Sequence, residues 1–362
     1  MKKYNYLSVL ALSVFFAFAS CKKSEDQLHV PAGNLKSNLA GGTHLPLTVV
    51  TIAGDPILNG LQDGAGNQAR FYYPFGIDVA GDGTIYVADE HNNKIRKITP
   101  PNIVSTINIP ATSDGVQFTM PVYVRVSTDG TLNIFTQGTT FTRGMERSIW
   151  ILKPDGTLIT PLPPSPYGGS RVIYSGLEKE PYGNFFWFTQ EHYYFPDYSP
   201  WEVPTALKKF YTDTNGRIGT SAFYPPRDSL ALPERNTTDY SITNLFCGYN
   251  SVKYLVINHN HIYKLTPSGV FTQIYKDLKF NYIFSLTGSK DNHILYVADK
   301  GTIKSIVNGK LQFLVGPQKY DITAVDGVGS SANVYAFSIV LSQDENTLYF
   351  SDHSTIRKLL LK

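Results

Sequence analysis

Short apolar runs separated by turn residues fill the chain from Leu47 to its end, and the spacing of an amphipathic helix is almost absent. Apolar runs bounded by Gly, Asn, Asp and Pro are typical of β-strands. Two segments at opposite ends match each other closely and differ mainly in the length of one turn: residues 63–98 and residues 326–359. A shared pattern of this length indicates a structural repeat. We therefore expect an all-β repeat protein.

Six segments with a common landmark indicate the number of repeats. Each is an aliphatic or aromatic run that ends in a polar residue: TIYVAD (84–89), TLNIFT (131–136), FFWFTQ (185–190), KYLVIN (253–258), ILYVAD (294–299) and TLYFSD (347–352). Residues 48–362 divide into six repeats of about 52 residues, near the length of a four-stranded propeller blade. The pattern predicts a six-bladed β-propeller in which these runs are the second strands.

Turn dipeptides recur after the strand runs and support this division. Asp-Gly, Asn-Gly and Ser-Gly pairs favour the positive backbone angles that two-residue hairpins need. We expect them between the third and fourth strands of a blade, at residues 129–130, 155–156, 215–216, 268–269 and 308–309.

The two ends of the repeat region complement each other. The last repeat stops after a third-strand run, IRKLLLK (356–362), whereas the first run, TVVTIAG (48–54), resembles a fourth strand with no blade before it. Pairing these two runs would close the ring and remove the exposed sheet edges. The sequence therefore predicts a propeller that is closed by its N-terminal strand pairing into the last blade.

The complete repeat has a recognisable form. The string AG…DGxGxxARFxxPxGIxVxxDGxIYVADxxNxxIRKI, present at residues 49–98 and less completely at 311–359, resembles the NHL repeat. The resemblance implies an NHL-like propeller, and such propellers serve as ligand platforms or, in some relatives, as lyases or lactonases. It implies the fold more firmly than the function, because one fold hosts many activities.

The first twenty residues read as an export signal. Two lysines precede an uncharged apolar run from Leu7 to Phe18, which is too short to span a bilayer comfortably. The run ends in FASC (18–21), which resembles the lipobox of bacterial lipoproteins; an ordinary secretory signal is the alternative. With Cys21 as the lipidated residue, we expect a lipoprotein signal peptide, a flexible polar tether and the propeller, at residues 1–20, 21–46 and 47–362.

This signal predicts an outer-membrane lipoprotein of the cell envelope, attached to the membrane through Cys21. The sequence KKSED after Cys21 resembles acidic export tags, which would bring the protein to the cell surface. The other cysteine, Cys247, lies in an apolar run and is expected to be a small buried hydrophobe. Without the two signal lysines the chain carries 30 basic and 29 acidic residues, so we expect no nucleic-acid partner.

Histidines that follow the second strands are the first candidates for chemistry. They are His91, His192, His259, His261 and His353. Amidating-lyase relatives of the NHL family place histidines around an axial zinc, but here the histidines lie in turns midway along each blade, too far apart to meet around one ion. We therefore interpret them as solvated turn residues and expect no metal site and no cofactor.

An acidic position recurs at the end of the second strands. Asp89, Asp299 and Asp352 occupy it, and Asn258 takes the same place in another repeat. A catalytic residue is needed only once, so we interpret these side chains as acceptors for backbone N–H groups of the following turn. An acidic ring for a cation or a general base is the alternative.

The most unusual segment is FFWFTQEHYYFPDYSPWEVP (185–204), in which an aromatic insertion follows a second strand. Tyrosine and tryptophan faces can stack on sugar rings while carboxylates bind the hydroxyls. The candidate ligand-binding residues are therefore Tyr193, Tyr194, Tyr198, Trp201, Glu191 and Asp197. The alternative is that these rings only fold the insertion onto its blade.

Together these patterns predict a lipid-anchored binding module that presents loops to an extracellular glycan or peptide, without catalysis. Two alternatives stay open: a metal-dependent lyase or lactonase with an axial site, and a scaffold in an envelope protein complex. The first strands are largely apolar, as in FGIDVA, YIFSLT and AFSIVL, which argues against an axial catalytic site. No catalytic residue is assigned.

Overall fold

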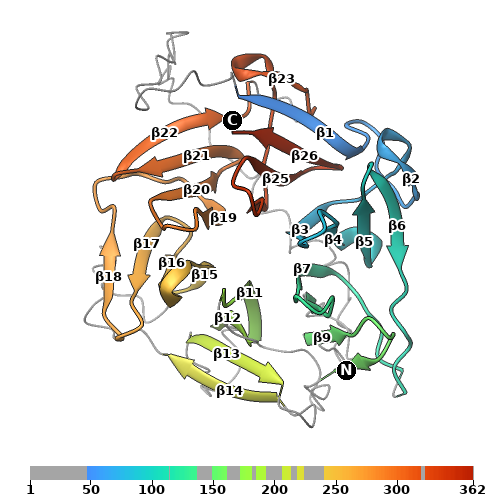
Figure 1. Ribbon diagram of the computed structural model, residues 1–362, viewed down its shortest axis with the longest axis horizontal. Coiled ribbons are helices and arrows are strands. Elements are labelled where there is room, and N and C mark those ends of the chain that lie inside the picture. Colours follow the sequence, from blue (N-terminus) through green and yellow to red (C-terminus); the bar gives the residue numbers. More distant parts are fainter. Residues whose placement is uncertain are drawn as a thin grey trace, which may run out of the picture. The chain divides into compact units, whose positions relative to one another are not determined.

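The described residues form six antiparallel sheets around a central axis, as Figure 1 shows. In this computed structural model they are residues 47–113, 115–136, 149–160, 172–181, 185–192, 206–212, 218–223, 240–318 and 323–361. The arrangement is the six-bladed β-propeller that the strand pattern predicted. Within these ranges no helix combines the length and the apolar character that a membrane span needs.

The first three blades follow one another along the chain, and each begins at the axis and ends at the rim. Blade 1 contains β3 (Pro74–Val79), β4 (Ile85–Asp89), β5 (Lys94–Thr99) and β6 (Ile103–Ile107). Blade 2 contains β7 (Pro121–Val126), β8 (Leu132–Thr136), β9 (Ile149–Leu152) and β10 (Leu158–Ile159). Blade 3 contains β11 (Val172–Lys179), β12 (Phe185–His192), β13 (Ala206–Thr212) and β14 (Ile218–Phe223).

The remaining blades keep the same order, but the last one takes a strand from the other end of the chain. Blade 4 contains β15 (Ile242–Cys247), β16 (Lys253–Ile257), β17 (His261–Leu265) and β18 (Phe271–Ile274). Blade 5 contains β19 (Ile283–Gly288), β20 (Ile294–Asp299), β21 (Thr302–Val307) and β22 (Lys310–Val315). Blade 6 contains β24 (Ile339–Leu341), β25 (Thr347–Asp352), β26 (Thr355–Leu360) and β1 (Thr48–Gly54).

Ring closure occurs as the sequence predicted. Strand β1 runs antiparallel to β26, from the pair Thr48 and Leu360 to the pair Gly54 and Thr355. In Figure 1 the two strands lie side by side although they come from opposite ends of the chain. Two short strands, β2 (Gly64–Ala65) and β23 (Gly327–Val328), add a fifth strand to blades 1 and 6.

The second strands are apolar because neighbouring blades cover both of their faces. Every residue of β8 and of β16 is buried. The cores lie between blades rather than within them: Ile95 of blade 1 packs with Ile134 and Trp150 of blade 2. All six landmark runs are second strands, as predicted.

The turn dipeptides were assigned correctly in three of the four hairpins that the structure describes. Gly156, Gly269 and Gly309 have positive φ angles and join third to fourth strands. The pair at 129–130 instead joins β7 to β8, the first and second strands of blade 2, and the pair at 215–216 lies outside the described residues. The prediction was wrong at 129–130 because such a dipeptide specifies a tight turn, not its place in a blade.

Candidate functional site

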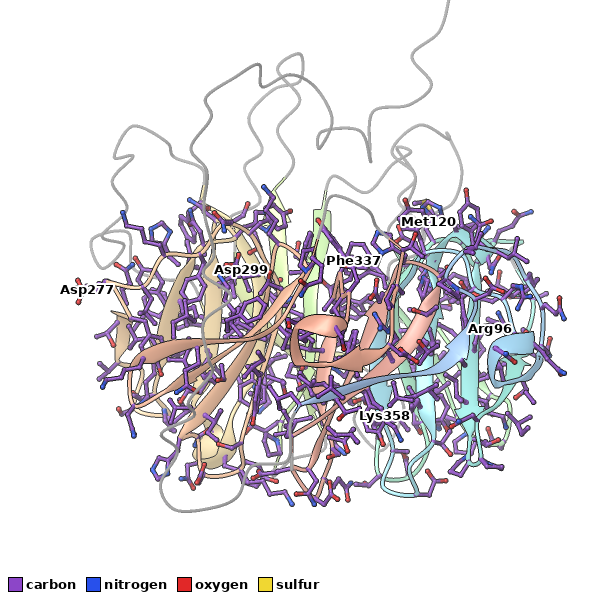
Figure 2. All side chains as sticks on the ribbon, turned by 90° about the horizontal axis from the view of Figure 1, so that it is seen from above. Arg96, Met120, Asp277, Asp299, Phe337 and Lys358 are labelled. Carbon is purple, nitrogen blue, oxygen red and sulfur yellow. The ribbon has the colours of Figure 1, made fainter. Side chains whose placement is uncertain are left out.

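The first strands begin, and the second strands end, on one side of the ring, which we call the entry face; the opposite side is the exit face. Figure 2 shows the ring from its edge, with Phe337, Asp299 and Met120 toward one side and Lys358 toward the other. Asp299 ends a second strand, so the side that carries it is the entry face.

The recurring Asp and Asn side chains lie on the entry face and hold the start of each first strand. Asp89 accepts a hydrogen bond from the backbone N–H of Tyr72 at 2.8 Å, and Asn258 accepts one from Ser241 at 2.8 Å. Each acceptor follows its donor by 17 residues. Two further bonds keep that separation, from Tyr282 to Asp299 and from Tyr335 to Asp352.

These side chains are structural hydrogen-bond acceptors, as interpreted from the sequence. The predicted donors, however, were wrong. We expected the following turn, and the donors instead precede the first strand of the same blade. The reason is the antiparallel pairing of first and second strands, which brings the end of β4 beside the start of β3, with Asp89 opposite Pro74. Sequence distance along one hairpin could not reveal this contact.

Aromatic residues at and before the innermost strands meet around the axis. Phe75 contacts Tyr123 and Phe337 at ring-centroid distances of 6.0 and 6.1 Å, and Phe337 contacts Phe284 at 5.5 Å. Tyr335 lies 5.3 Å from Phe337. Apart from Tyr335 and Phe337, which directly precede β24, they belong to the innermost strands. All five are half-buried. They come from blades 1, 2, 5 and 6, and we call them the axial aromatic cluster.

Three histidines pack against aromatic rings on the entry face, so the expectation of solvated turn residues is wrong for them. His259 stacks on Tyr282 at 3.9 Å with an interplanar angle of 16°. His91 packs against Tyr72 and Tyr73 at 4.8 and 4.7 Å. His353 lies 5.4 Å from Phe337. Turn position alone does not expose a ring when the preceding segment supplies an aromatic partner.

Burial shifts the pKa values of groups on this face. It lowers the pKa of His259 to about 4 and also lowers the pKa of His91. It raises the pKa of Glu90, which follows Asp89, to about 7. Perturbed pKa values cluster at functional sites, so these groups mark the entry face as the candidate ligand-binding surface. In the described parts of the chain, no group of three or more His, Cys, Asp or Glu residues could hold a metal ion.

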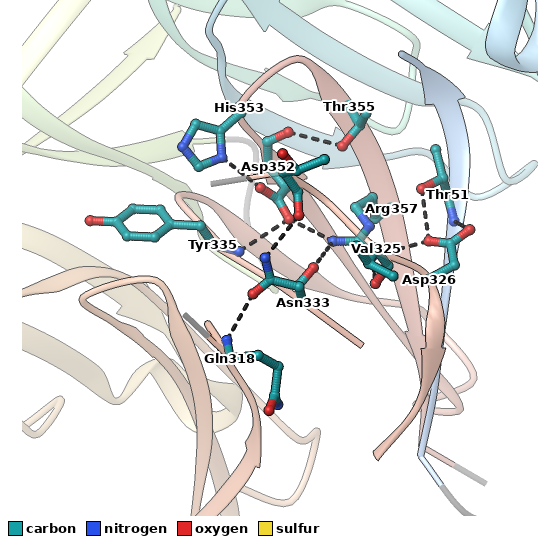
Figure 3. A network of polar contacts seen from close by, with 11 residues as sticks. Thr51, Gln318, Val325, Asp326, Asn333, Tyr335, Asp352, His353, Thr355 and Arg357 are labelled. Carbon is teal, nitrogen blue, oxygen red and sulfur yellow. Dashed lines mark hydrogen bonds and ion pairs between the residues drawn. The ribbon is translucent and has the colours of Figure 1, made fainter. Parts of the chain in front are cut away.

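Ionic networks support the entry face in blades 1 and 6. In blade 6, shown in Figure 3, Arg357 donates to Asp352 at 2.7 Å and to Asp326 at 3.0 Å, and Asp326 also accepts bonds from Thr51 of β1 at 2.8 Å. Asp352 and the guanidinium of Arg357 are both fully buried. The network thus connects the clamp at Tyr335 to the closing strand.

Blade 1 repeats this arrangement residue for residue. Arg96 bonds Asp89 at 2.8 Å and Asp63 at 2.7 Å, and Asp63 accepts from the backbone and hydroxyl of Thr106 at 3.0 and 2.9 Å. Burial raises the pKa of Asp89. The hydrogen bonds that Asp89 accepts from Asn92 and Arg96 shift its pKa in the opposite direction. These repeated carboxylates have structural partners and are not an acidic ring for a ligand.

Most of the sequence-predicted site residues lie outside the described residues. These are Cys21, Tyr193, Tyr194, Asp197, Tyr198 and Trp201. Glu191 belongs to β12, and only its backbone is described. Cys247 is a free, buried cysteine as predicted.

Sequence reasoning missed the axial aromatic cluster, although a signal for it is present. The pattern Tyr-x-Phe followed by a small and an aliphatic residue begins at Tyr73, Tyr282 and Tyr335, at the start of three first strands. The sequence interpretation above treats these strands only as apolar. The recurrence of an aromatic pair at the same place in three blades could have placed rings at one end of the axis.

Comparisons with known proteins support the fold. No protein-family model and no curated protein sequence matches the chain. Among solved structures, a protein of unknown function from Bacteroides thetaiotaomicron is 16% identical with a TM-score of 0.60, covering 87% of this chain and 76% of its own. An auxiliary nutrient binding protein from Bacteroides thetaiotaomicron is 13% identical with a TM-score of 0.59, covering 86% and 76%.

A third solved structure belongs to an enzyme. A streptogramin B lyase is 16% identical with a TM-score of 0.51, covering 88% of this chain and 98% of its own. At such identities the likeness concerns the arrangement of the strands. The chain is thus a six-bladed β-propeller similar in fold to both binding proteins and enzymes.

Proposed function

We propose that this protein is a ligand-binding propeller of the bacterial cell envelope and that its ligand contacts the axial aromatic cluster. The observation that carries the proposal is the contact of half-buried rings from four blades around the axis, including Phe75, Phe284 and Phe337. Aromatic rings that are only partly covered at a convergence of several elements are suited to bind apolar ligand faces.

A glycan is the ligand class that we favour. Sugar rings present flat C–H faces that stack on aromatic side chains, while their hydroxyls need polar partners. Glu90 and His91 supply polar groups on the same face. Strand β12, a second strand, ends at the entry face, and the segment with Tyr198 and Trp201, which lies outside the described residues, follows it in the sequence. Its rings and carboxylates would extend the binding surface.

The predicted lipoprotein signal and the structural neighbours support a role in the cell envelope. The lipobox-like sequence at Cys21 would anchor the protein to the outer membrane, and the tether would let the propeller reach a ligand outside. A Bacteroides protein with a similar fold is described as an auxiliary nutrient binding protein. Binding of an extracellular glycan is consistent with both observations.

A glycan array with the full chain, with and without added divalent metals, tests the proposal. We expect binding that does not need metal and that Phe337→Ala weakens about tenfold, the effect of losing one stacking partner. Tyr198→Ala and Trp201→Ala test the insertion in the same way. Phe313→Ala is the matched control, because Phe313 is 47% exposed but lies on β22 at the rim.

Three outcomes would contradict the proposal. The first is an array without any bound glycan, and the second is equal binding by the Phe337→Ala and Phe313→Ala proteins. The third is metal-dependent turnover of a lactone or of a lyase substrate, which would support the enzyme alternative instead.

A further inference from the structure

One loop of the entry face exposes three large aliphatic side chains. It comprises residues 55–61 and begins where the closing strand β1 ends opposite Thr355. Ile57 is 78% exposed, Leu58 54% and Leu61 52%. Single apolar side chains on a surface are normal, whereas a group of them on one short loop indicates a contact site. We call residues 55–61 the aliphatic loop.

Hydrogen bonds hold the backbone of the aliphatic loop in place. The carboxylate of Asp55 accepts from the N–H groups of Ile57 and Leu58, both at 2.9 Å, and pairs with Arg70 at 3.3 Å. The carbonyl of Asp55 accepts from the hydroxyl of Ser354 at 2.6 Å. The exposed side chains are therefore carried by a backbone that is fixed at its start.

Three rings of blade 1 form a group on the same face. The ring centroids of Tyr72 and Tyr73 are 5.8 Å apart, and His91 packs against both. Tyr72 is 37% exposed and Tyr73 40%. The two tyrosines thus offer open ring surface to a ligand.

Gly60 joins the aliphatic loop to these rings. Its N–H donates to the carbonyl of Phe71 at 3.0 Å, and its carbonyl accepts from the side-chain amide of Asn92 at 2.7 Å. Phe71 directly precedes Tyr72, and Asn92 directly follows His91. The rings and the loop are therefore neighbouring parts of one surface.

The equivalent place in blade 6 lacks the second exposed tyrosine. The hydrogen bonds to the recurring Asp make Tyr72 of blade 1 equivalent to Tyr335 of blade 6. The next residue is Tyr73 in blade 1, with a φ of +50°, and the fully buried Ala336 in blade 6. A positive φ is uncommon for a bulky residue. Because blade 6 forms with alanine here, packing of the blade does not require an exposed ring.

A carboxyl group lies beside the three rings. The N–H of Glu90 donates to the carbonyl of Tyr73 at 3.3 Å, and Glu90 directly precedes His91. The carboxyl of Glu90 has no hydrogen-bond or ion-pair partner among the described residues, and burial alone raises its pKa to about 7. It therefore has hydrogen-bonding capacity left for a ligand.

The extent of this surface favours a small ligand over a protein partner. Its exposed large side chains in the described part of the chain are two tyrosines and three aliphatic residues. A stable protein interface takes about 20–30 residues from each partner. An alkyl or aryl group is small enough to be covered by three aliphatic side chains.

We propose that the glycan bound at the entry face carries an apolar substituent, which lies on the aliphatic loop while its last sugar contacts Tyr72, Tyr73 and Glu90. The inference rests on the proposed function, because it takes the ligand to be a glycan and adds the group by which the protein selects it. Sugar faces stack on aromatic rings, and an alkyl group gains free energy when it leaves water. The axial aromatic cluster binds other units of the same glycan.

Isothermal titration of the full chain with two glucosides tests the inference. The probes are methyl β-D-glucoside and n-octyl β-D-glucoside, the latter kept below the concentration at which it forms micelles. They share the sugar and differ only in the alkyl chain. We expect the octyl glucoside to bind at least about tenfold more tightly, the effect of burying about two methylene groups. Equal affinities, or no binding of the octyl glucoside at millimolar concentration, would overturn the inference.

Variants of exposed residues locate the alkyl chain. Combined Ile57→Ser and Leu58→Ser substitution should lower the affinity for the octyl glucoside to that for the methyl glucoside. Val270→Ser is the matched control, because Val270 is 54% exposed, as Leu58 is, but lies in the hairpin between β17 and β18 of blade 4. A preference for the octyl glucoside that survives the double substitution, or that Val270→Ser also removes, would refute the inference.

Failure of this inference can be distinguished from failure of the proposed function. Phe337→Ala should weaken glycan binding on the array but leave the ratio of the two glucoside affinities unchanged, because Phe337 does not belong to the aliphatic loop. A silent array with a loop-dependent octyl preference would refute the axial site and support the apolar subsite. Glycan binding that depends on Phe337, without any octyl preference, would support the proposed function and refute the inference.

Discussion

Buried ion pairs recur at equivalent places in the first and last blades, at Arg96 with Asp89 and at Arg357 with Asp352. In blade 5 a lysine takes the place of the arginine, and Lys304 bonds Asp299 at 2.7 Å. Arginine reaches further, because its second nitrogen also bonds Asp63 or Asp326 at the edge of the sheet. At the scale of single residues, these carboxylates hold loops and strands in place.

Replacement of Arg357 tests this role. Arg357→Met should lower the free energy of unfolding by about 3–5 kcal/mol, because Asp352 would remain buried without its cation. Arg357→Lys should cost less, since blade 5 shows that a lysine can reach the equivalent Asp. Urea denaturation measures both, with Lys358→Met on the same strand as a near-neutral control. Similar losses for Arg357→Met and Lys358→Met would refute the role.

His259 gives a prediction about pH. Its pKa is lowered to about 4 by burial, whereas an exposed histidine titrates near 6.5. The unfolded chain therefore binds a proton between these values that the folded chain does not, so His259 makes the protein less stable as pH falls from about 6.5 to 4. The Tm advantage of the wild type over His259→Gln should be smaller at pH about 5 than at pH about 7.

The control for this pH effect is His293→Gln, because the side chain of His293 is 78% exposed. Its difference from the wild type should change much less between the two pH values. An equal pH response of the two variants would mean that burial of His259 does not determine its protonation.

Hairpins and strand ends show how closely neighbouring elements approach. The closing strand β1 ends at Gly54, whose φ is +96° and where an added Cβ would lie 2.3 Å from the carbonyl oxygen of Ser354. Gly156, in a hairpin of blade 2, has a similar φ of +86° but open space around it. At the scale of elements, Gly54 combines a glycine conformation with a backbone contact that leaves no room for a side chain, whereas Gly156 has the conformation alone.

Alanine substitution separates the strain of the left-handed backbone from the steric clash of an added Cβ. Gly156→Ala should cost about 1 kcal/mol, the strain of a left-handed backbone alone. Gly54→Ala should cost at least about 3 kcal/mol, because the clash adds to that strain and pushes β1 away from β26. Thermal unfolding of both variants makes the comparison. Equal losses would show that the end of the closing strand adapts easily.

The whole molecule depends on a contact between its two ends. Without β1, blade 6 would expose the edge of β26, and the ring would lose the pairing that joins its ends. Blades share cores with both neighbours, so an open ring weakens more than one interface. Closure is therefore a property of the complete ring.

Two truncations test this dependence. A chain that starts at residue 45 should keep the Tm of the full chain, because β1 is intact. A chain that starts at residue 55 should lose cooperative unfolding and aggregate through the exposed edge of β26. Calorimetry and light scattering measure both properties. A soluble, cooperatively folding second chain would show that closure is dispensable.

The fold could be predicted from the sequence because it depends on local and repeated patterns. The six second-strand runs, the turn dipeptides and the unmatched strand at 48–54 each carry their structural meaning within a few residues. Because the repeat occurs six times, the same local pattern supports the assignment of each blade. Even the recurring Asp could be recognised as structural, because it returns in one blade after another.

The candidate sites were decided by the tertiary structure. Phe75 and Phe337 meet only because closure makes blades 1 and 6 neighbours. The partner of Asp89 is set by strand pairing, and the ion pair of Arg125 in blade 2 with Glu178 in blade 3 forms because these blades are neighbours. Sequence determines which strands form and how they repeat, since those choices rest on short-range patterns. Which side chains face one another across the axis depends on ring geometry, which no single repeat contains.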